Sequence, residues 1–86
     1  MFLHIGGNID ILNREIIAIL NIKTLEAKKM PHRIKAQWGN LTPAEQKNIK
    51  SVIITREEIY FSPISSLTLQ SRGKGYAWMK EETYGQ

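Results

Sequence analysis

The stretch NIKSVIITREEIYFSPISS, residues 48–66, decides the fold. Two runs within it, 49–55 and 59–62, are rich in the β-branched and aromatic residues that favour strands. The charged triplet Arg56-Glu57-Glu58 separates the two runs and has the length of a hairpin loop. We therefore predict two strands, Ile49–Thr55 and Ile59–Ser62, joined by a turn whose charges lie in solvent.

The residues upstream predict three more strands. Gly6-Gly7 separates the β-prone runs 2–5 and 8–12, and it can supply the positive φ angles that a tight hairpin requires. The run Ile16–Leu20 is apolar at every position and is too short for a clear helix. We expect it to form a strand that is buried on both faces, so that something must cover its second face.

The segment 24–38 predicts the main helix, because its apolar residues recur at the spacings of an amphipathic helix. Thr24 could be its N-cap, but Pro31 would then lie inside the helix at a cost of about 3 kcal/mol. The helix could instead begin near Pro31. Gly39-Asn40 then ends it with residues that tolerate left-handed geometry.

Two shorter helix signals follow. Thr42, Pro43 and Glu45 have the spacing of a capping box with proline in the first turn, so they predict a short helix. Ser65 or Ser66 can cap a brief C-terminal helix, which Gly73 ends.

These elements predict a small α+β domain at residues 1–74, followed by a C-terminal tail at 75–86. The expected order is β-β-β-α-β-β-α, with about five short strands in a mixed or antiparallel sheet, one main helix and a short C-terminal helix. The tail is unusual because it contains three aromatic residues, which often dock on their own domain or on a neighbour: Tyr76, Trp78 and Tyr84.

The composition fits one globular domain of 86 residues, of which 42% are hydrophobic and 23% are charged. The absence of cysteine excludes disulfides and Cys-based metal sites. No segment approaches the roughly 20 apolar residues of a membrane span, and the start of the chain lacks a signal pattern. We expect a cytoplasmic protein without a membrane partner.

No pattern in the sequence points to catalysis. His4 and His32 have no second ligand at a metal-binding spacing. The pairs Glu57-Glu58 and Glu81-Glu82 are adjacent, and neighbouring residues of a strand point to opposite faces, so neither pair would flank a scissile bond. We expect a protein that is not an enzyme and that uses no cofactor or metal.

Basic residues do form a pattern, within a net charge of +4 that suits a polyanionic partner. Arg14 lies between two apolar strands, while Lys47 and Lys50 lie just before another, so all three could project from one rim of the sheet and contact phosphates. For Arg14 the alternative is a local salt bridge with Glu15 or Asp10. A second basic group is more simply a solvated helix face: Lys28, Lys29, Arg33 and Lys35.

The order of these features resembles the extracellular matrix regulatory protein family, specifically its B branch (RemB). The likeness covers roughly residues 3–72 and rests on IGGNIDILNREIIAIL at 5–20, KSVIIT at 50–55 and IYFSPISSLTL at 59–69. It implies a small α+β fold and a bacterial transcriptional regulator of extracellular matrix (biofilm) genes. In the related A branch (RemA), subunits form a ring whose basic outer rim binds DNA.

The resemblance implies double-stranded DNA and a homo-oligomeric ring as partners, with a paralogous regulator subunit as a further one. The DNA-contacting arginine of the family falls on Arg14, and its basic cluster falls on Lys47, Asn48 and Lys50. Where the A branch has consecutive arginines, this chain has Lys47-Asn48 and so loses a bidentate phosphate donor. A ring would also explain Ile16–Leu20, because a neighbouring subunit would cover its second face.

Two other functions remain open. A protein-interaction or co-assembly subunit that has lost DNA binding is favoured by Asn48 and by the aromatic tail. An RNA-binding sheet requires aromatic residues exposed on one face, but Tyr60 and Phe61 are adjacent and should point to opposite faces.

Overall fold

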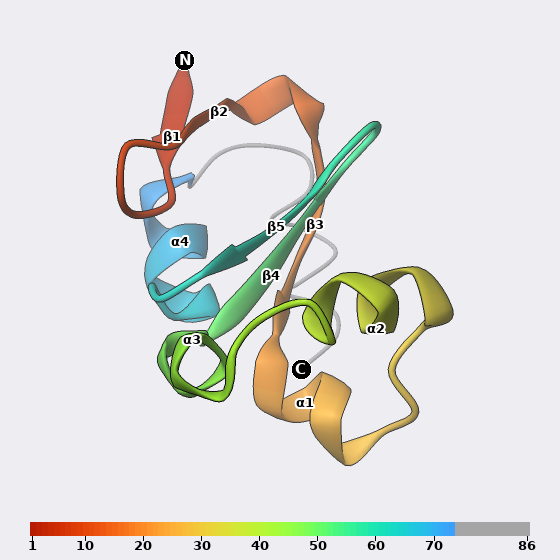
Figure 1. Cartoon of the computed structure of the whole chain (residues 1–86). Helices are drawn as coiled ribbons and strands as arrows, with labels where there is room; N and C mark the ends of the chain where they lie inside the picture. The colour runs from red at the N-terminus through yellow and green to blue at the C-terminus, as the bar shows by residue number, and fades with distance from the viewer. Residues whose placement is uncertain (74–86) are drawn as a thin grey trace.

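Two antiparallel sheets form the β part of the fold in the computed structural model, which describes residues 1–73 (Figure 1). The predicted tail at 75–86 lies outside these described residues. The elements are β1 (Phe2–His4), β2 (Asp10–Leu12), the 3-10 helix η1 (Asn13–Glu15), β3 (Ile16–Asn21), α1 (Ile22–Ala27), α2 (His32–Trp38), α3 (Pro43–Asn48), β4 (Ser51–Thr55), β5 (Ile59–Ser62) and α4 (Ser66–Arg72). The predicted α+β fold is confirmed, with its five strands divided between a two-stranded and a three-stranded sheet.

The first sheet is the predicted N-terminal hairpin of β1 and β2. Phe2 pairs with Leu12 and His4 pairs with Asp10. Gly6 and Gly7 adopt φ angles of +110° and +57°, which residues with a side chain rarely adopt. A Cβ atom on Gly6 would also lie 3.0 Å from Cδ of Pro63. The hairpin turn therefore requires glycine at position 6 both for its backbone and for its packing.

We expect Gly6→Ala to lower the free energy of unfolding by about 1–3 kcal/mol, because alanine is strained at positive φ and meets the Pro63 ring. The matched control is Gly39→Ala, since Gly39 has an ordinary helical φ of −66°. This control should be neutral or stabilising by up to about 1 kcal/mol, because alanine restricts the unfolded chain. Urea denaturation measures both variants, and equal losses would contradict the role given to the Gly6 backbone.

The second sheet has the order β3-β4-β5, so β4 is its central strand. All its pairs are antiparallel: Asn21 lies opposite Ser51, and Val52 lies opposite Phe61. The charged hairpin turn between β4 and β5 lies where the sequence predicted it, although β4 begins at Ser51 rather than at Ile49.

A bulge interrupts the pairing of β3 between Ile16 and Ala18. Because the bulge adds one residue, Ile16 and Ile19 both face the core, with exposed fractions of 5% and 0%, while Ile17 is 50% exposed. The prediction that Ile16–Leu20 is buried on both faces is therefore wrong for a single chain. The bulge turns one isoleucine of this apolar run outward.

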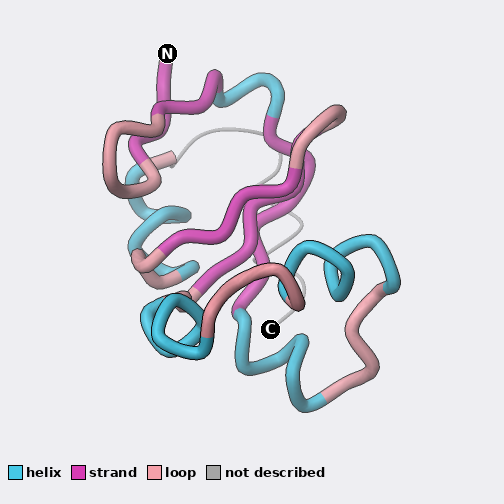
Figure 2. The backbone as a smooth tube through the Cα atoms, viewed as in Figure 1, coloured by secondary structure: helices cyan, strands magenta, loops and turns pink. Residues whose placement is uncertain are grey.

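The predicted main helix is divided into two short helices, α1 and α2, which a loop separates (Figure 2). The N-cap of α1 is Asn21, whose side chain accepts a hydrogen bond of 2.8 Å from the Lys23 backbone N–H, so the proposal of Thr24 as N-cap is wrong. Helix α2 begins immediately after Pro31, the alternative start that the sequence offered. Gly39 ends α2 in the right-handed helical region, so left-handed geometry is not used there.

The two later helices begin as predicted. Thr42 accepts a hydrogen bond from the Glu45 backbone N–H at 3.1 Å, and its own N–H donates to the Glu45 carboxylate at 2.8 Å, which completes the capping box of α3. Ser65 caps α4 by accepting from the Thr68 backbone N–H, and Gly73 is the C-cap. No helix among residues 1–73 is long and apolar enough to cross a bilayer.

The core consists of two clusters, one on each face of the three-stranded sheet. Alternation along β4 sends Ile53 to the first cluster and Val52 to the second. Tyr60 packs against the first and Phe61 against the second, which confirms that these aromatic residues point to opposite faces. The first cluster lies between the sheet, the N-terminal hairpin and α4: Leu3, Ile5, Ile11, Ile16, Ile19, Ile53 and Leu69. The second lies beside α1 and α2: Ile22, Ile34, Val52 and Ile59.

Buried serines join the two sheets. The Ser62 hydroxyl donates a hydrogen bond of 2.6 Å to the Ile5 carbonyl and accepts one of 3.0 Å from the Ile64 backbone N–H. The Ser51 hydroxyl donates to the Ile64 carbonyl at 2.7 Å. Because a buried hydroxyl needs a partner, the Ser62 bond fixes the N-terminal hairpin against the end of β5, while the Ser51 bond fixes the loop after β5 to β4.

Candidate nucleic-acid interface

Lys47 and Lys50 lie close together, at the junction of α3 and β4. Lys47 is in the last turn of α3, and Ile49 ends the helix by donating its N–H to the Gln46 carbonyl at 3.2 Å. The Lys50 backbone N–H donates to the Ser62 carbonyl at 2.8 Å, while the Lys50 carbonyl accepts from the Ile22 N–H at 3.1 Å. The backbone of Lys50 is therefore held on one side by the end of β5 and on the other by the start of α1, and both lysine side chains are exposed.

Arg14 lies at the other end of β3. It is an exposed residue of η1, directly before β3. Because β3 and β4 are antiparallel, the start of β3 lies beside Thr55 and its end lies beside Ser51 and Lys50. The length of β3 therefore separates Arg14 from Lys50, which is roughly 20 Å at about 3.3 Å for each residue. The expectation of one shared rim is wrong within a single chain, whereas contact of these residues with DNA stays a prediction.

The three candidate cations have no carboxylate partner in the part of the chain that the structure describes. Within residues 1–73, the one ion pair joins His4 Nδ1 and Asp10 Oδ1 at 2.9 Å, and it is charged on both sides only when the histidine is protonated. Asp10 is thus paired with His4 and not with Arg14, and Glu15 is not within ion-pair distance of Arg14. The local salt bridge that offered a simpler role for Arg14 is not formed.

The second basic group behaves as a solvated surface. Lys28, Lys29 and Lys35 are exposed. Arg33 has a structural contact, because its Nη2 donates a hydrogen bond of 3.2 Å to the Glu57 carbonyl in the turn between β4 and β5. These observations support the simpler of the two interpretations of this group.

Asn13, next to Arg14, is a feature that sequence reasoning missed. It is only 1% exposed, and its side-chain amide has no hydrogen-bond partner within residues 1–73. Its backbone N–H donates to the Met1 carbonyl at 3.0 Å. An inward Asn13 followed by an exposed Arg14 means that the 3-10 turn directs the guanidinium group to solvent.

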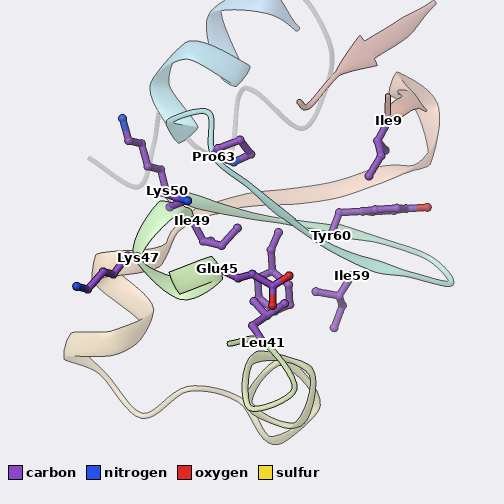
Figure 3. Close-up of a pocket in the computed structure, with 11 residues that line it drawn as sticks. Ile9, Leu41, Glu45, Lys47, Ile49, Lys50, Ile59, Tyr60 and Pro63 are labelled. Carbon is purple, nitrogen blue, oxygen red and sulfur yellow. The ribbon is translucent and has the colours of Figure 1, made fainter. Parts of the chain in front are cut away.

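A groove of about 710 Å³ runs beside these lysines (Figure 3). Ile59, Tyr60 and Phe61 all line it, although adjacent strand residues point to opposite faces, so the groove follows the edge of β5 rather than one face of the sheet. In Figure 3 the ammonium groups of Lys47 and Lys50 point away from the groove. Its other lining residues are Ile9, Leu41, Glu45, Asn48, Ile49 and Pro63.

No group of three or more metal-ligating side chains occurs among the residues that the structure describes. The arrangement offers exposed cations at two ends of one strand and an apolar groove along the edge of another. It is suited to binding a charged surface and an extended segment.

The comparisons with known proteins point in one direction. The family model RemA-like, described as extracellular matrix regulatory protein A-like, matches residues 2–72. The chain is also 30% identical, over 74 residues, to extracellular matrix regulatory protein B of Bacillus subtilis (strain 168), an alignment that covers 86% of this chain and 91% of that protein. No solved structure matches the chain.

Proposed function

Because the chain belongs to the RemA-like family of extracellular matrix regulatory proteins, we propose that it regulates bacterial matrix genes by binding duplex DNA as a ring-shaped homo-oligomer. The resemblance drawn from the sequence is confirmed by the family match. The relative's printed name supports a regulator of matrix genes, and a regulator that acts on DNA works in the bacterial cytoplasm.

The observation that carries DNA binding is the set of exposed cations without carboxylate partners within residues 1–73: Arg14, Lys47 and Lys50. A cation already paired with a carboxylate must give up that partner before it binds a phosphate. Within residues 1–73 these three have no such partner to give up, and each phosphate contact releases counterions from the duplex. The mechanism is therefore electrostatic.

Sequence choice would come mainly from the shape of the DNA. Direct reading of bases uses bidentate side chains such as arginine or asparagine in the major groove. The lysines at the junction of α3 and β4 are single-point donors, and only Arg14 carries a planar fork. Phosphate contacts from such residues position the protein without reading bases, so bending and groove width would decide which promoters bind.

A ring is supported by surfaces that a single chain leaves uncovered. Ile17 of β3 is 50% exposed, although it belongs to the most apolar run of the chain. Both β3 and β5 are edge strands of their sheet. A ring would multiply the few phosphate contacts of each subunit into avidity along the duplex.

The groove along β5 favours a second candidate function, a co-assembly subunit that acts through proteins rather than DNA. A paralogous regulator subunit would be its partner. Asn48 supports this alternative because it lies beside Lys47, where the A branch has a second arginine. Both candidate functions agree with the prediction that the protein is not an enzyme.

The test is fluorescence anisotropy of a labelled AT-rich duplex titrated with the full chain at several salt concentrations, with light scattering on the same samples. We expect an oligomer whose affinity falls steeply with salt, by about 0.9 in log K per unit of log salt for each phosphate contact. A well-folded oligomer that fails to bind at low salt would refute the DNA proposal and leave the co-assembly function.

A further inference from the structure

The backbone of β5 has groups that face away from its sheet. Thr55 N–H donates to the Glu58 carbonyl at 2.9 Å, which places 55 and 58 in a hydrogen-bonded pair. Such pairs alternate along an antiparallel ladder. The backbone N–H and C=O groups of Tyr60 and Ser62 therefore point to β4, while those of Ile59 and Phe61 point to the groove. No hydrogen bond joins the backbone of Ile59 or Phe61 to another element of residues 1–73. An edge with unpaired groups is a template for one more strand.

The opposite edge of the same sheet, β3, also has outward groups. Ile22 N–H donates to the Lys50 carbonyl at 3.1 Å, so alternation turns the backbone of Ile19 and Asn21 away from β4. The bulge at Ile17 ends the regular part of this edge, which leaves Ala18–Asn21. This stretch has the same length as β5, Ile59–Ser62.

The shapes of the two edges differ. The β5 edge lies in a groove, with Ile9 on one side and Leu41 on the other (Figure 3). Two such grooves placed face to face would hold their β5 strands apart, because their walls would meet first. The β3 edge instead carries the outward Ile17. A concave edge and an edge that carries an exposed apolar side chain, on the same chain, fit a head-to-tail contact between two copies.

We propose that β3 of one copy adds to β5 of the next in the groove, so that one continuous sheet runs through the ring. This inference rests on the proposed ring, and it names the two surfaces that form it. The incoming strand is a second copy of this chain, and its exposed Ile17 would lie beside Ile59 at the end of the groove. Strand addition satisfies the backbone groups of both edges at once.

Ring symmetry decides the direction of this added strand. Within one chain β3 and β5 run in the same direction, because each is antiparallel to β4. In a closed ring of many copies, the rotation from one copy to the next is small, so β3 of the next copy keeps nearly the same direction. The joint between copies is therefore parallel, whereas every pair within a chain is antiparallel.

The outward N–H and C=O groups of β5 and β3 alternate along the two strands in the register that a parallel pair requires. Aligning Ile59–Ser62 with Ala18–Asn21 places Ile59 and Phe61, which face outward, opposite Ala18 and Leu20, which face inward. The outward backbone groups of Ile19 and Asn21 then alternate along the joint with those of Ile59 and Phe61. In a parallel ladder the bonding residues of one strand lie between those of the other, as in this alignment.

The joint determines where the cations lie on the ring. All copies keep Arg14 at one end of β3 and Lys50 at the other, so the ring has two separate circles of positive charge roughly one strand length apart. Since the ammonium groups of Lys47 and Lys50 point away from the groove, filling it leaves them accessible. The three predicted contacts thus serve two different lines of phosphates.

Disulfide trapping tests the joint, because the chain has no cysteine of its own. The parallel joint places position 17 opposite 58 and position 21 opposite 62. We therefore expect Ile17→Cys with Glu58→Cys, and Asn21→Cys with Ser62→Cys, to give reducible ladders of covalent multimers. The same four positions paired the other way, Ile17→Cys with Ser62→Cys and Asn21→Cys with Glu58→Cys, would be joined by an antiparallel contact and should give none. Within one chain β4 lies between β3 and β5, so these two strands are about 10 Å apart, which is too far for a disulfide.

Light scattering and DNA anisotropy on each reduced variant separate this inference from the proposed function. Ladders from the two parallel pairs alone support the joint, whether or not the protein binds DNA. Assembly without these ladders, or ladders from the reversed pairs, overturns the joint even if DNA binding persists. A wild-type protein that stays monomeric overturns both the joint and the ring. Ladders without DNA binding at low salt overturn the proposed DNA function alone.

Discussion

Replacing Lys47 and Lys50 together by alanine is expected to weaken duplex binding by roughly tenfold or more near physiological salt. Both side chains are exposed, and neither is within ion-pair distance of a carboxylate in residues 1–73. The slope of log K against log salt should fall by about 0.9 for each phosphate that the variant no longer binds, summed over the subunits that touch the duplex. Anisotropy titrations at several salt concentrations measure both quantities.

The matched control removes the same charge elsewhere. Lys28 and Lys29 are exposed residues between α1 and α2, so Lys28→Ala with Lys29→Ala lowers the net charge equally without touching the proposed site. This control should keep most of the affinity and of the salt slope. If both double variants lost affinity to the same extent, net charge rather than position would govern binding, and the assignment of Lys47 and Lys50 would be wrong.

Ile53→Ala should remove much of the stability of the fold. Ile53 lies in the central strand β4, is 0% exposed and faces Ile19 and Tyr60 on the neighbouring strands. Truncating such a side chain costs about 2–5 kcal/mol, because it removes buried methyl groups and leaves a cavity. The total free energy of unfolding of an ordinary domain is only about 5–15 kcal/mol. Urea denaturation followed by circular dichroism measures the loss.

The comparison for this variant is Leu67→Ala in α4. Leu67 is 72% exposed, so its truncation should change the free energy of unfolding by no more than about 0.5 kcal/mol. Protein concentration must be equal for both variants, because assembly adds to apparent stability. Similar losses for the two would show that Ile53 is not part of a tightly packed core.

Local signals located the caps and turns of this fold from sequence. The capping box of Thr42 and Glu45 depends on atoms only three residues apart, and the Gly6-Gly7 turn depends on one backbone requirement. The sequence predicted only one of the two helix starts in the segment expected to form the main helix. Pro31 marked the second start, but Asn21 is both the last residue of β3 and the N-cap of α1, and the sequence shows no break there.

The candidate site depends on pairing direction, which sequence does not show. Arg14 and Lys50 each precede a strand, and this suggests a common end. Their strands pair antiparallel, so the residues before them lie at opposite ends of the sheet. The groove was missed for a related reason, since β5 is an edge strand only because of the order of strands in space.

The hydrogen bond from Ser62 to the Ile5 carbonyl has a consequence for how the protein is made. The hairpin of β1 and β2 is synthesised before Ser62 and Leu69, yet it packs on Leu69 and is bonded by Ser62, near the other end of the described residues. An isolated two-stranded hairpin is marginal in water. The first strands therefore cannot fold stably until Ser62 and Leu69 have been synthesised, and we expect these distant contacts to slow the folding rate.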